Sequence, residues 1–316
     1  MNDDLRSIFS DVADAIRSKA GTASEYHPSE FATEILNIPT GGGGGGSFIS
    51  PLEYKESTIQ SYSGDEDLIL ARAFELCINL ETVSFPECTY IDNYAFWGCS
   101  SLSNISFPKC SYIASSAFFM CTSLTNISFP KCNIIGSWAF RDCKSLTTIS
   151  FPNCSTVYWH AFGDCWSLTS ANFPKCTNID SYAFYRCSSL SNISFPECSY
   201  IGSGVFMNCR SLTNVSFPKC KVVGAEAFRF CSLLSVASFP NCNNIYWDAF
   251  KSCTNLSSLY LLGSSIVSLY HSSVFDGTPL SAGGTGKIYV PSSLYNTYKT
   301  ATNWSKISAR ITSYTE

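Results

Sequence analysis

Cysteine recurs at every eleventh residue from Cys77 to Cys253, without an insertion or a deletion. Phenylalanine keeps twice that interval from Phe74 to Phe250, and leucine does the same from Leu80 to Leu256. The repeating unit is therefore 22 residues long and holds two cysteines. A fixed period of this size is typical of a solenoid, in which each coil packs only on its neighbours. The period predicts a stack of coils in place of one globular core.

The coil spanning residues 99–118 shows how one unit is expected to fold. Its segment Leu102–Phe107 ends in an alternation of apolar and polar residues, which predicts a short strand. Pro108 ends this strand because proline has no N–H to donate to a ladder. Ile113 begins a second extended piece, and Ala117-Phe118 turns the chain into the next coil. Since stacked strands lie about 4.8 Å apart, nine such units would form a rod roughly 40 Å long.

The seventeen cysteines have two interpretations. One is a disulfide framework, as in small secreted domains. The other is two columns of buried free thiols that act as small hydrophobic side chains. Cysteines stacked at about 4.8 Å with parallel side chains exceed the usual Cβ separation of a disulfide, so packing favours free thiols. The chain has no Cys-x-x-Cys pair, which leaves zinc and thioredoxin-type sites without support.

The repeated run is Ala-Phe-x-x-Cys-x-x-Leu-x-x-Ile-x-Phe-Pro. Clear copies are Ala139-Phe140, Cys143, Leu146, Ile149 and Phe151-Pro152, and then Ala183-Phe184, Cys187, Leu190, Ile193 and Phe195-Pro196. This run resembles the BspA-like leucine-rich repeat family over about residues 68–262. The resemblance implies a β-solenoid used for adhesion and for binding proteins or glycans, and it implies no catalytic residues. The tail from Lys287 to Trp304 is similar to segments that often follow such repeats.

The N-terminal segment has a different character. Residues 5–19 place apolar side chains on one helical face, and a second short helix begins near Pro28, so we expect a helical hairpin. The phrase from Val12 to Ile35 resembles N-terminal modules of tail-associated proteins from phages of Gram-positive bacteria. That resemblance implies that residues 1–40 bind a tail or baseplate protein and that the chain forms a homo-oligomer, a trimer. A generic helical hairpin is the alternative, since an amphipathic pattern names no partner.

Six consecutive glycines, Gly41 to Gly46, follow this segment. No strand precedes them and no helix follows, which favours a flexible tether over a dinucleotide-binding loop. The predicted domains are a helical anchoring or oligomerisation module at 1–40, a Gly-rich linker at 41–50, a leucine-rich repeat solenoid at 51–262 and a C-terminal cap at 263–316. In the cap we expect a strand at Tyr289-Val290 and a short helix from Ser293 to Ala301.

The positions that flank Ala-Phe differ from coil to coil, whereas the cysteine, leucine and phenylalanine positions stay constant. Their mixture of Tyr, Trp, Ser, Gly, Asp and Arg matches binding surfaces such as antibody loops. Trp and Tyr are also common at binding hot spots. We therefore predict a binding stripe along the coils. The alternative is filler that covers the turns, with Trp159 and Trp247 packed inward. The candidate ligand-binding residues are Tyr94, Trp97, Phe119, Trp138, Arg141, Tyr158, Trp159, His160, Trp166, Tyr182, Tyr185, Arg186, Arg229, Tyr246 and Trp247.

Catalytic chemistry has little support in the sequence. The three histidines form no metal-ligand motif, and neither a phosphate loop nor a nucleophile elbow is present. Asp142 and Asp164 lie one repeat apart, which could bring them near the separation of a glycosidase pair. A solvated acidic pair at the surface is the commoner arrangement. We predict no catalytic residues, no metal site and no cofactor, with a glycan-cleaving enzyme as a minor alternative.

Charge and hydropathy limit the classes of partner that the chain is expected to bind. The net charge is −4 and 14% of residues are charged, too little to steer the chain to nucleic acid. No apolar run is long enough to span a membrane, and the start Met1-Asn2-Asp3-Asp4 lacks the features of a secretory signal. We predict a phage tail receptor-binding protein, assembled in the bacterial cytoplasm and carried in the virion, that contacts a host cell-surface glycan or protein. The alternatives are a BspA-like adhesin at the bacterial cell surface and an intracellular assembly scaffold.

Overall fold

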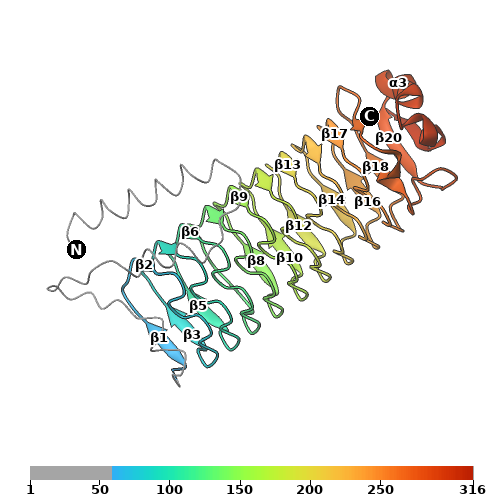
Figure 1. The fold of residues 1–316 in the computed structure, drawn as a ribbon. Helices are drawn as coiled ribbons and strands as arrows, with labels where there is room; N and C mark the ends of the chain where they lie inside the picture. Colours follow the sequence, from blue (N-terminus) through green and yellow to red (C-terminus); the bar gives the residue numbers. More distant parts are fainter. Residues whose placement is uncertain (1–58, 316) are drawn as a thin grey trace. The chain divides into compact units, whose positions relative to one another are not determined.

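The computed structural model describes residues 59–315. These residues form a β-solenoid of short parallel strands joined by turns (Figure 1). The predicted fold class, a β-rich solenoid of 22-residue leucine-rich repeats, is thus confirmed. The predicted helical hairpin, its resemblance to phage tail modules and the Gly-rich linker all fall outside the described residues.

One wall of the solenoid is a ten-stranded parallel sheet of two-residue strands. Strands pair across one repeat, as Ile91 does with Ile113. In chain order they are β2 (Leu68–Ile69), β4 (Tyr90–Ile91), β6 (Tyr112–Ile113), β7 (Ile134–Ile135), β9 (Thr156–Val157), β11 (Asn178–Ile179), β13 (Tyr200–Ile201), β15 (Val222–Val223), β17 (Asn244–Ile245) and β19 (Ser268–Leu269). The second residue of each strand is apolar and buried, and this constant position fixes the register.

The other wall consists of three-residue strands whose middle side chain packs on the core. They are β1 (Ser61–Ser63), β3 (Thr82–Ser84), β5 (Asn104–Ser106), β8 (Thr148–Ser150), β10 (Ser170–Asn172), β12 (Asn192–Ser194), β14 (Asn214–Ser216), β16 (Val236–Ser238) and β18 (Ser258–Tyr260). They divide into sheets of three, three and five parallel strands, the last completed by β20 (Lys287–Pro291) and β21 (Ile311–Tyr314). The outward side chains of this wall are mostly Ser, Thr and Asn.

The strands are shorter than the sequence pattern predicts. β5 covers only Asn104–Ser106 of the predicted segment Leu102–Phe107, and the two end residues lie outside the strand with their side chains buried in the core. β6 ends at Ile113, where the second extended piece was expected to begin. Pro108 does follow the strand and lies in a turn, as predicted.

Two columns of stacked phenylalanine rings run through the interior. Rings of the first column, Phe74 to Phe250, lie 5.0–5.5 Å from the ring one coil away, measured between centroids. In the second column, Phe85 to Phe239, the same distance is 5.1–6.2 Å. Burying each ring contributes roughly 1.5–3 kcal/mol. Each coil therefore depends for its stability on the coils above and below it.

The cysteines are buried free thiols, as the packing argument predicts. The Cys99 thiol donates to the Phe74 carbonyl of the preceding coil at 3.0 Å, and this contact recurs up to Cys253. In the other column, the Cys88 thiol donates to the Tyr90 carbonyl at 3.3 Å. Burial raises the pKa of the Cys88 thiol to about 11 and that of the Cys110 thiol to about 12, so both remain protonated at neutral pH.

A third ladder of hydrogen bonds joins the turns that carry Ala-Phe. In one coil the amides of Ser116, Phe118 and Met120 donate to carbonyls of the next coil at 2.9, 2.8 and 2.9 Å. Bonds within the turn alternate with these, as from the Phe119 amide to the Ser116 carbonyl at 3.2 Å. The same pattern recurs along the solenoid. The turn face is therefore held between coils by backbone bonds, as the two strand walls are.

In the C-terminal cap, side chains form the hydrogen bonds to the last coil that a further coil would otherwise form. Besides β20 and β21 it contains η1 (Ser272–Phe275), η2 (Ser292–Leu294), α3 (Tyr295–Thr300) and η3 (Ser305–Arg310). The buried Tyr298 hydroxyl accepts from the Val267 amide at 3.0 Å, and the buried Trp304 indole donates to the Val267 carbonyl at 2.7 Å. These bonds satisfy backbone groups that would otherwise be left unpaired at the last coil. β20 contains the predicted strand Tyr289-Val290, and α3 lies within the predicted helix.

Candidate functional site

Each turn around Ala-Phe holds two residues in the left-handed backbone region. We call the residue before alanine the first turn column and the residue two places after phenylalanine the second turn column. In the first column φ lies between 52° and 62°, and in the second between 57° and 73°. The first column is Arg72, Tyr94, Ser116, Trp138, His160, Tyr182, Gly204, Glu226 and Asp248, and the second is Leu76, Gly98, Met120, Asp142, Asp164, Arg186, Asn208, Phe230 and Ser252.

This backbone limits which side chains the turn face accepts. The left-handed region costs a residue with a Cβ roughly 1–2 kcal/mol, and it is least tolerant of β-branched side chains. Neither turn column contains Val, Ile or Thr. Within that limit the residues still range from glycine to tryptophan. The backbone therefore explains which residues are missing, but not why Trp and Tyr are present.

Seven side chains on the turn face form a continuous chain of ring contacts that we call the aromatic ladder. Its members, from five consecutive coils, are Trp97, Phe119, Trp138, Trp159, His160, Tyr182 and Tyr185. Ring centroids are 6.3 Å apart from Trp97 to Phe119, 5.8 Å from Phe119 to Trp138 and 5.3 Å from Trp138 to Trp159. At about 4.8 Å per coil, the ladder extends roughly 19 Å along the solenoid axis.

His160 lies at the centre of the ladder and is nine-tenths buried. Its ring stacks on Tyr182 at 5.0 Å and meets Trp159 edge-on at 4.6 Å. Burial and the nearby Arg141 charge lower the pKa of His160 to about 4, although Asp164 acts in the opposite direction. His160 is therefore neutral at pH 7 and packs against the neighbouring rings. The predicted stripe places His160 at the surface, so the structure differs from the prediction at this residue.

The turn face changes character at both ends of the solenoid. Where the central coils carry rings, the end coils carry ion pairs three residues apart: Arg72 with Glu75, Glu226 with Arg229, and Lys251 with Asp248. Each of these pairs joins the residue before alanine to the residue after phenylalanine. The frame is the same in all these coils, so the continuous chain of ring contacts is a local feature of the middle, while single aromatic residues such as Trp247 and Phe230 also occur in the end coils.

Asp142 and Asp164 are held by cations instead of being solvated, so the expectation of a freely solvated acidic pair is wrong. The Arg141 guanidinium lies 3.0 Å from Asp164 and 3.8 Å from Asp142, measured between the nearest charged atoms. Lys144 lies 3.7 Å from Asp142, and Arg186 lies 3.9 Å from Asp164. Asp164 is buried because it lies beneath both arginines. Burial and the Asp164 charge raise the pKa of Asp142.

Apart from Trp159, which belongs to the ladder, the predicted residues described next lie outside its chain of ring contacts. Trp159 and Trp247 are 41% and 49% exposed, so the alternative in which both pack inward is wrong. Trp166 is exposed and carries Lys144 over its ring at 4.7 Å. The other contacts are Arg72 over Tyr94 at 4.6 Å, Arg229 over Phe230 at 4.8 Å, and Tyr246 stacked on Tyr270 at 4.3 Å. Tyr158 is exposed beside Trp159.

Three features of this face are absent from the sequence prediction. They are the left-handed backbone, Lys144 among the cations, and the small residues that make room for rings. A Cβ on Gly204 would lie 2.3 Å from the Tyr182 ring, and one on Gly163 would lie 3.0 Å from the His160 Nδ1 atom. The exclusion of β-branched residues from both turn columns is a sequence signal that could have revealed the backbone conformation.

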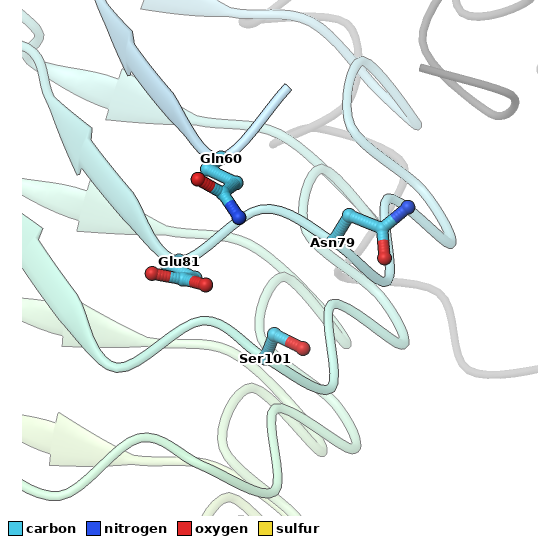
Figure 2. Close-up of a pocket in the computed structure, with 4 residues that line it drawn as sticks. All are labelled: Gln60, Asn79, Glu81 and Ser101. Carbon is cyan, nitrogen blue, oxygen red and sulfur yellow. The ribbon is translucent and has the colours of Figure 1, made fainter. Parts of the chain in front are cut away.

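No deep cleft accompanies the ladder among the described residues. Figure 2 shows a shallow polar recess near the first coils, lined by Gln60, Asn79, Glu81 and Ser101. Across residues 59–315, no group of three or more His, Cys, Asp or Glu side chains is arranged to hold a metal ion. The helices in this part of the chain are too short and polar to cross a bilayer. The turn face is therefore the candidate site, and it is an open surface.

Comparison with known proteins places the repeats in a family. The family model described as BspA type leucine rich repeat region matches residues 67–191 and 177–306. Among solved structures, a leucine rich cell surface protein from Faecalibacterium prausnitzii is 24% identical, with a TM-score of 0.41, over 61% of this chain and 62% of that one. A leucine rich repeat protein of T. pallidum is 29% identical over 60% of this chain and 72% of that one, with a TM-score of 0.39.

A third solved structure, a leucine-rich repeat protein from Eubacterium ventriosum, is 16% identical over 76% of this chain and 91% of that one, with a TM-score of 0.44. The match to the F. prausnitzii protein leaves more than a third of that solved chain uncovered. A search of curated proteins finds no match to this chain. Because the family model covers well over half of the sequence, the chain belongs to the BspA type leucine rich repeat family.

Proposed function

We propose that this protein is a non-enzymatic recognition or adhesion protein and that the aromatic ladder is its binding surface. One observation carries the proposal: the aromatic residues of the turn face touch one another over five consecutive coils, whereas the end coils carry ion pairs at the same positions. Packing does not require this difference, because the core columns are the same throughout. A cluster of aromatic side chains on an otherwise repetitive surface is typical of a site that binds a partner.

The chemistry of the ladder suits a large partner on a cell surface, either a glycan or a protein. Its rings offer apolar faces next to N–H and O–H groups, a combination that Trp and Tyr provide at interfaces. Neighbouring coils fix the ring positions, so little side-chain freedom would be lost on binding. An open face about five coils long has room for a polymer or a protein surface.

Two biological settings accommodate this role. Membership of the BspA type family fits an adhesin at the bacterial cell surface. The resemblance of residues 12–35 to tail-associated proteins is the basis of the other setting, a phage tail receptor-binding protein with residues 1–40 attached to the tail or baseplate. We favour the adhesin, because the family match covers residues 67–306, whereas the tail resemblance is confined to residues 12–35. The genes beside this one would separate the two: baseplate genes favour the virion, and secretion or sorting genes favour the adhesin.

The carboxylates of the turn face support a binding role over glycan cleavage. A glycosidase needs one carboxyl group that donates a proton and another that acts as base or nucleophile. Asp164 is buried and lies 3.0 Å from Arg141 and 3.9 Å from Arg186, measured between the nearest charged atoms. Asp142 faces Lys144 and Arg141. These contacts fit a structural role for the two carboxylates, and release of sugar from cell-wall material would contradict it.

The test is the binding of labelled full-length protein to a panel of bacterial and epithelial cells. The ladder variant combines Trp97→Ser, Trp138→Ser, Tyr182→Ser and Tyr185→Ser, because Ser116 shows that serine fits the first turn column. The control combines Tyr90→Ser, Tyr112→Ser, Tyr200→Ser and Tyr270→Ser on the ten-stranded wall and its edge. Hot-spot aromatic residues each contribute about 2 kcal/mol or more, so the ladder variant should lose more than about 100-fold in affinity.

Circular dichroism should show that both variants keep the fold of the wild type, since the phenylalanine columns are untouched. The proposal requires strong loss in the ladder variant and near wild-type binding in the control. Equal binding by the wild type and the ladder variant would reject the ladder as the binding surface. Loss in the control alone would assign binding to the ten-stranded wall.

A further inference from the structure

Three cations lie over aromatic rings in the central coils, and this arrangement gives the ladder a charge. Arg141 lies 5.1 Å from the Trp138 ring centroid, Lys144 lies 4.7 Å from that of Trp166, and Arg186 lies 5.0 Å from that of Tyr185. We call Arg141, Lys144 and Arg186 the ladder cations. A cation over a ring face is held in place while its N–H groups remain available to a ligand.

The carboxylates beside these cations lie lower on the surface. The Lys144 and Arg186 side chains are 42% and 56% exposed, whereas those of Asp142 and Asp164 are 22% and 8% exposed. Three cations therefore face two carboxylates, and the outermost groups are positive. This surplus stands out in a chain whose net charge is −4. A ligand approaching the ladder meets the cations first.

The end coils of the turn face pair their charges one to one, and an unpaired cation outside the ladder cations, Arg210, lies three coils beyond Lys144 and donates to Asn208 at 3.2 Å. At Arg72–Glu75, Glu226–Arg229 and Asp248–Lys251 the turn face pairs one cation with one carboxylate. On the edge that follows Phe-Pro, Lys109 pairs with Glu87 and Lys219 pairs with Glu197, while Lys175 donates to the Asn153 side chain. The ladder cations and the rings thus lie in the same coils, which a general role in solubility does not explain.

Unpartnered nitrogens at the same place point to a ligand rich in acceptors. The Trp138 indole Nε1 atom, the Arg141 Nε atom and the His160 Nδ1 atom are buried without a hydrogen-bond partner. The first two can only donate hydrogen bonds. Buried donors without acceptors are rare in folded proteins and call for an explanation. Gly163 leaves the space beside His160 Nδ1 free of a side chain. The Trp138 indole N–H therefore has no acceptor among the described residues, although Asp164 and Asp142 lie beside Arg141.

We propose that the aromatic ladder binds an acidic polysaccharide, with sugar rings packed along the aromatic side chains and carboxylates paired with Lys144 and Arg186. This inference rests on the proposed function of the ladder as a binding surface. Carboxylate oxygens would accept from the exposed Lys144 and Arg186 side chains, and charge-assisted hydrogen bonds to Arg and Lys are stronger than neutral ones. The linear arrangement favours a polysaccharide over a folded protein, since the rings follow the axis for roughly 19 Å, one or two per coil.

The probe is polygalacturonate, a polymer of carboxylate-bearing sugars, and binding to the full-length protein is measured by calorimetry at low salt. Its methyl ester keeps the sugar chain and removes the charge, and polyglutamate keeps the charge and removes the sugar. Polygalacturonate should bind at least about tenfold more tightly than either, because hydrogen bonds to charged groups are lost in one and ring contacts in the other. Its affinity should also fall with added salt.

The variant combines Lys144→Gln and Arg186→Gln, two exposed side chains whose loss leaves the phenylalanine columns intact. It should lose about tenfold or more in affinity for polygalacturonate. The matched control, Lys109→Gln with Lys219→Gln, removes the same charge elsewhere and should bind like the wild type. If the methyl ester bound as tightly as polygalacturonate, the ligand would be a neutral glycan and the requirement for acidic groups would be wrong. If polyglutamate bound as tightly as polygalacturonate, the requirement for sugar rings would be wrong.

The outcome separates this inference from the proposed function. If polygalacturonate does not bind but the ladder variant still loses cell binding, the acidic polysaccharide is wrong as the ligand, and the ladder remains the recognition surface. Failure of the ladder variant to lose cell binding overturns the proposed function itself.

Discussion

At the scale of single residues, the backbone of each turn decides which side chains can occupy the turn face. The amides of Trp138 and Asp142 donate to carbonyls of the next coil at 2.9 and 3.0 Å while φ is positive at both residues. Bonds between coils therefore fix the left-handed conformation, whatever the side chain. Glycine adopts this conformation without a penalty, and other residues, apart from proline and the β-branched ones, adopt it at a similar backbone cost. This tolerance allows a uniform frame to carry unlike side chains.

Ser252 in the second turn column tests this account of the backbone. It has φ of 61°, so Ser252→Gly should relieve strain and stabilise the fold by about 1 kcal/mol. Ser252→Thr adds a β-branch at the same place and should destabilise the fold by an amount of similar order. Urea unfolding followed by circular dichroism gives both midpoints. A threonine variant as stable as the glycine variant would contradict the backbone constraint.

His160 gives the central coils a pH dependence. Its pKa is lowered to about 4 in the fold by burial and by Arg141, whereas an unfolded histidine has a pKa of about 6.5. Between these values the unfolded chain binds a proton that the folded chain does not, so this group lowers stability as the pH falls. The thermal midpoint should therefore drop from pH 7 to pH 4.5, and the drop should be smaller in His160→Asn, which tolerates positive φ. An equal drop in both proteins would show that His160 does not titrate in this way.

At the scale of elements, the repeat identifies equivalent positions, but not the geometry between them. The 22-residue period was enough to predict the stacked strands and the buried thiols. It could not predict that φ is positive at Trp138, since handedness is a property of the whole turn. It also missed the burial of Asp164, because that depends on how far Arg141 reaches from the preceding coil.

The same limit applies to the candidate site. Constant spacing places Trp138, His160 and Tyr182 in one column, and their rings are indeed neighbours. Tyr246 belongs to a different contact, with Tyr270 of the cap. Which rings touch depends on the direction of each side chain and on the space beside it. The Tyr182 ring, for example, lies where a side chain on Gly204 would be. Periodicity predicts neighbouring positions, and packing decides which of them make contact.

The cap depends on side chains that satisfy the backbone of the last coil. Trp304→Phe keeps an aromatic ring but removes the indole N–H that reaches the Val267 carbonyl at 2.7 Å. A buried carbonyl left without its donor costs about 1–3 kcal/mol, so the urea midpoint should fall accordingly. The control is Trp247→Phe, whose side chain is 49% exposed and which should shift stability by less than about 0.5 kcal/mol. Equal midpoints for the two variants would argue against this role of Trp304.

At the scale of the whole solenoid, a constant frame supports a surface that changes along its length. The phenylalanine and cysteine columns run through every coil from Phe74 to Phe250, so stability is shared among all of them. The turn face is divided into end coils with neutral ion pairs and central coils with rings and excess cations. Each coil adds about 4.8 Å, which spaces the rings evenly. The account attributes binding to this middle section.

The most direct test is to measure side-chain oxidation by hydroxyl radicals, with the protein free and then bound to the cells or polymer that it recognises. The account predicts protection of Trp97, Phe119, Trp138, Trp159, Tyr182 and Tyr185, which form the accessible part of the aromatic ladder. It predicts unchanged oxidation of Tyr112, Tyr200 and Tyr270, on the ten-stranded wall and at its edge. Protection of these three tyrosines, with the ladder oxidised at the same rate as in the free protein, would contradict the central claim.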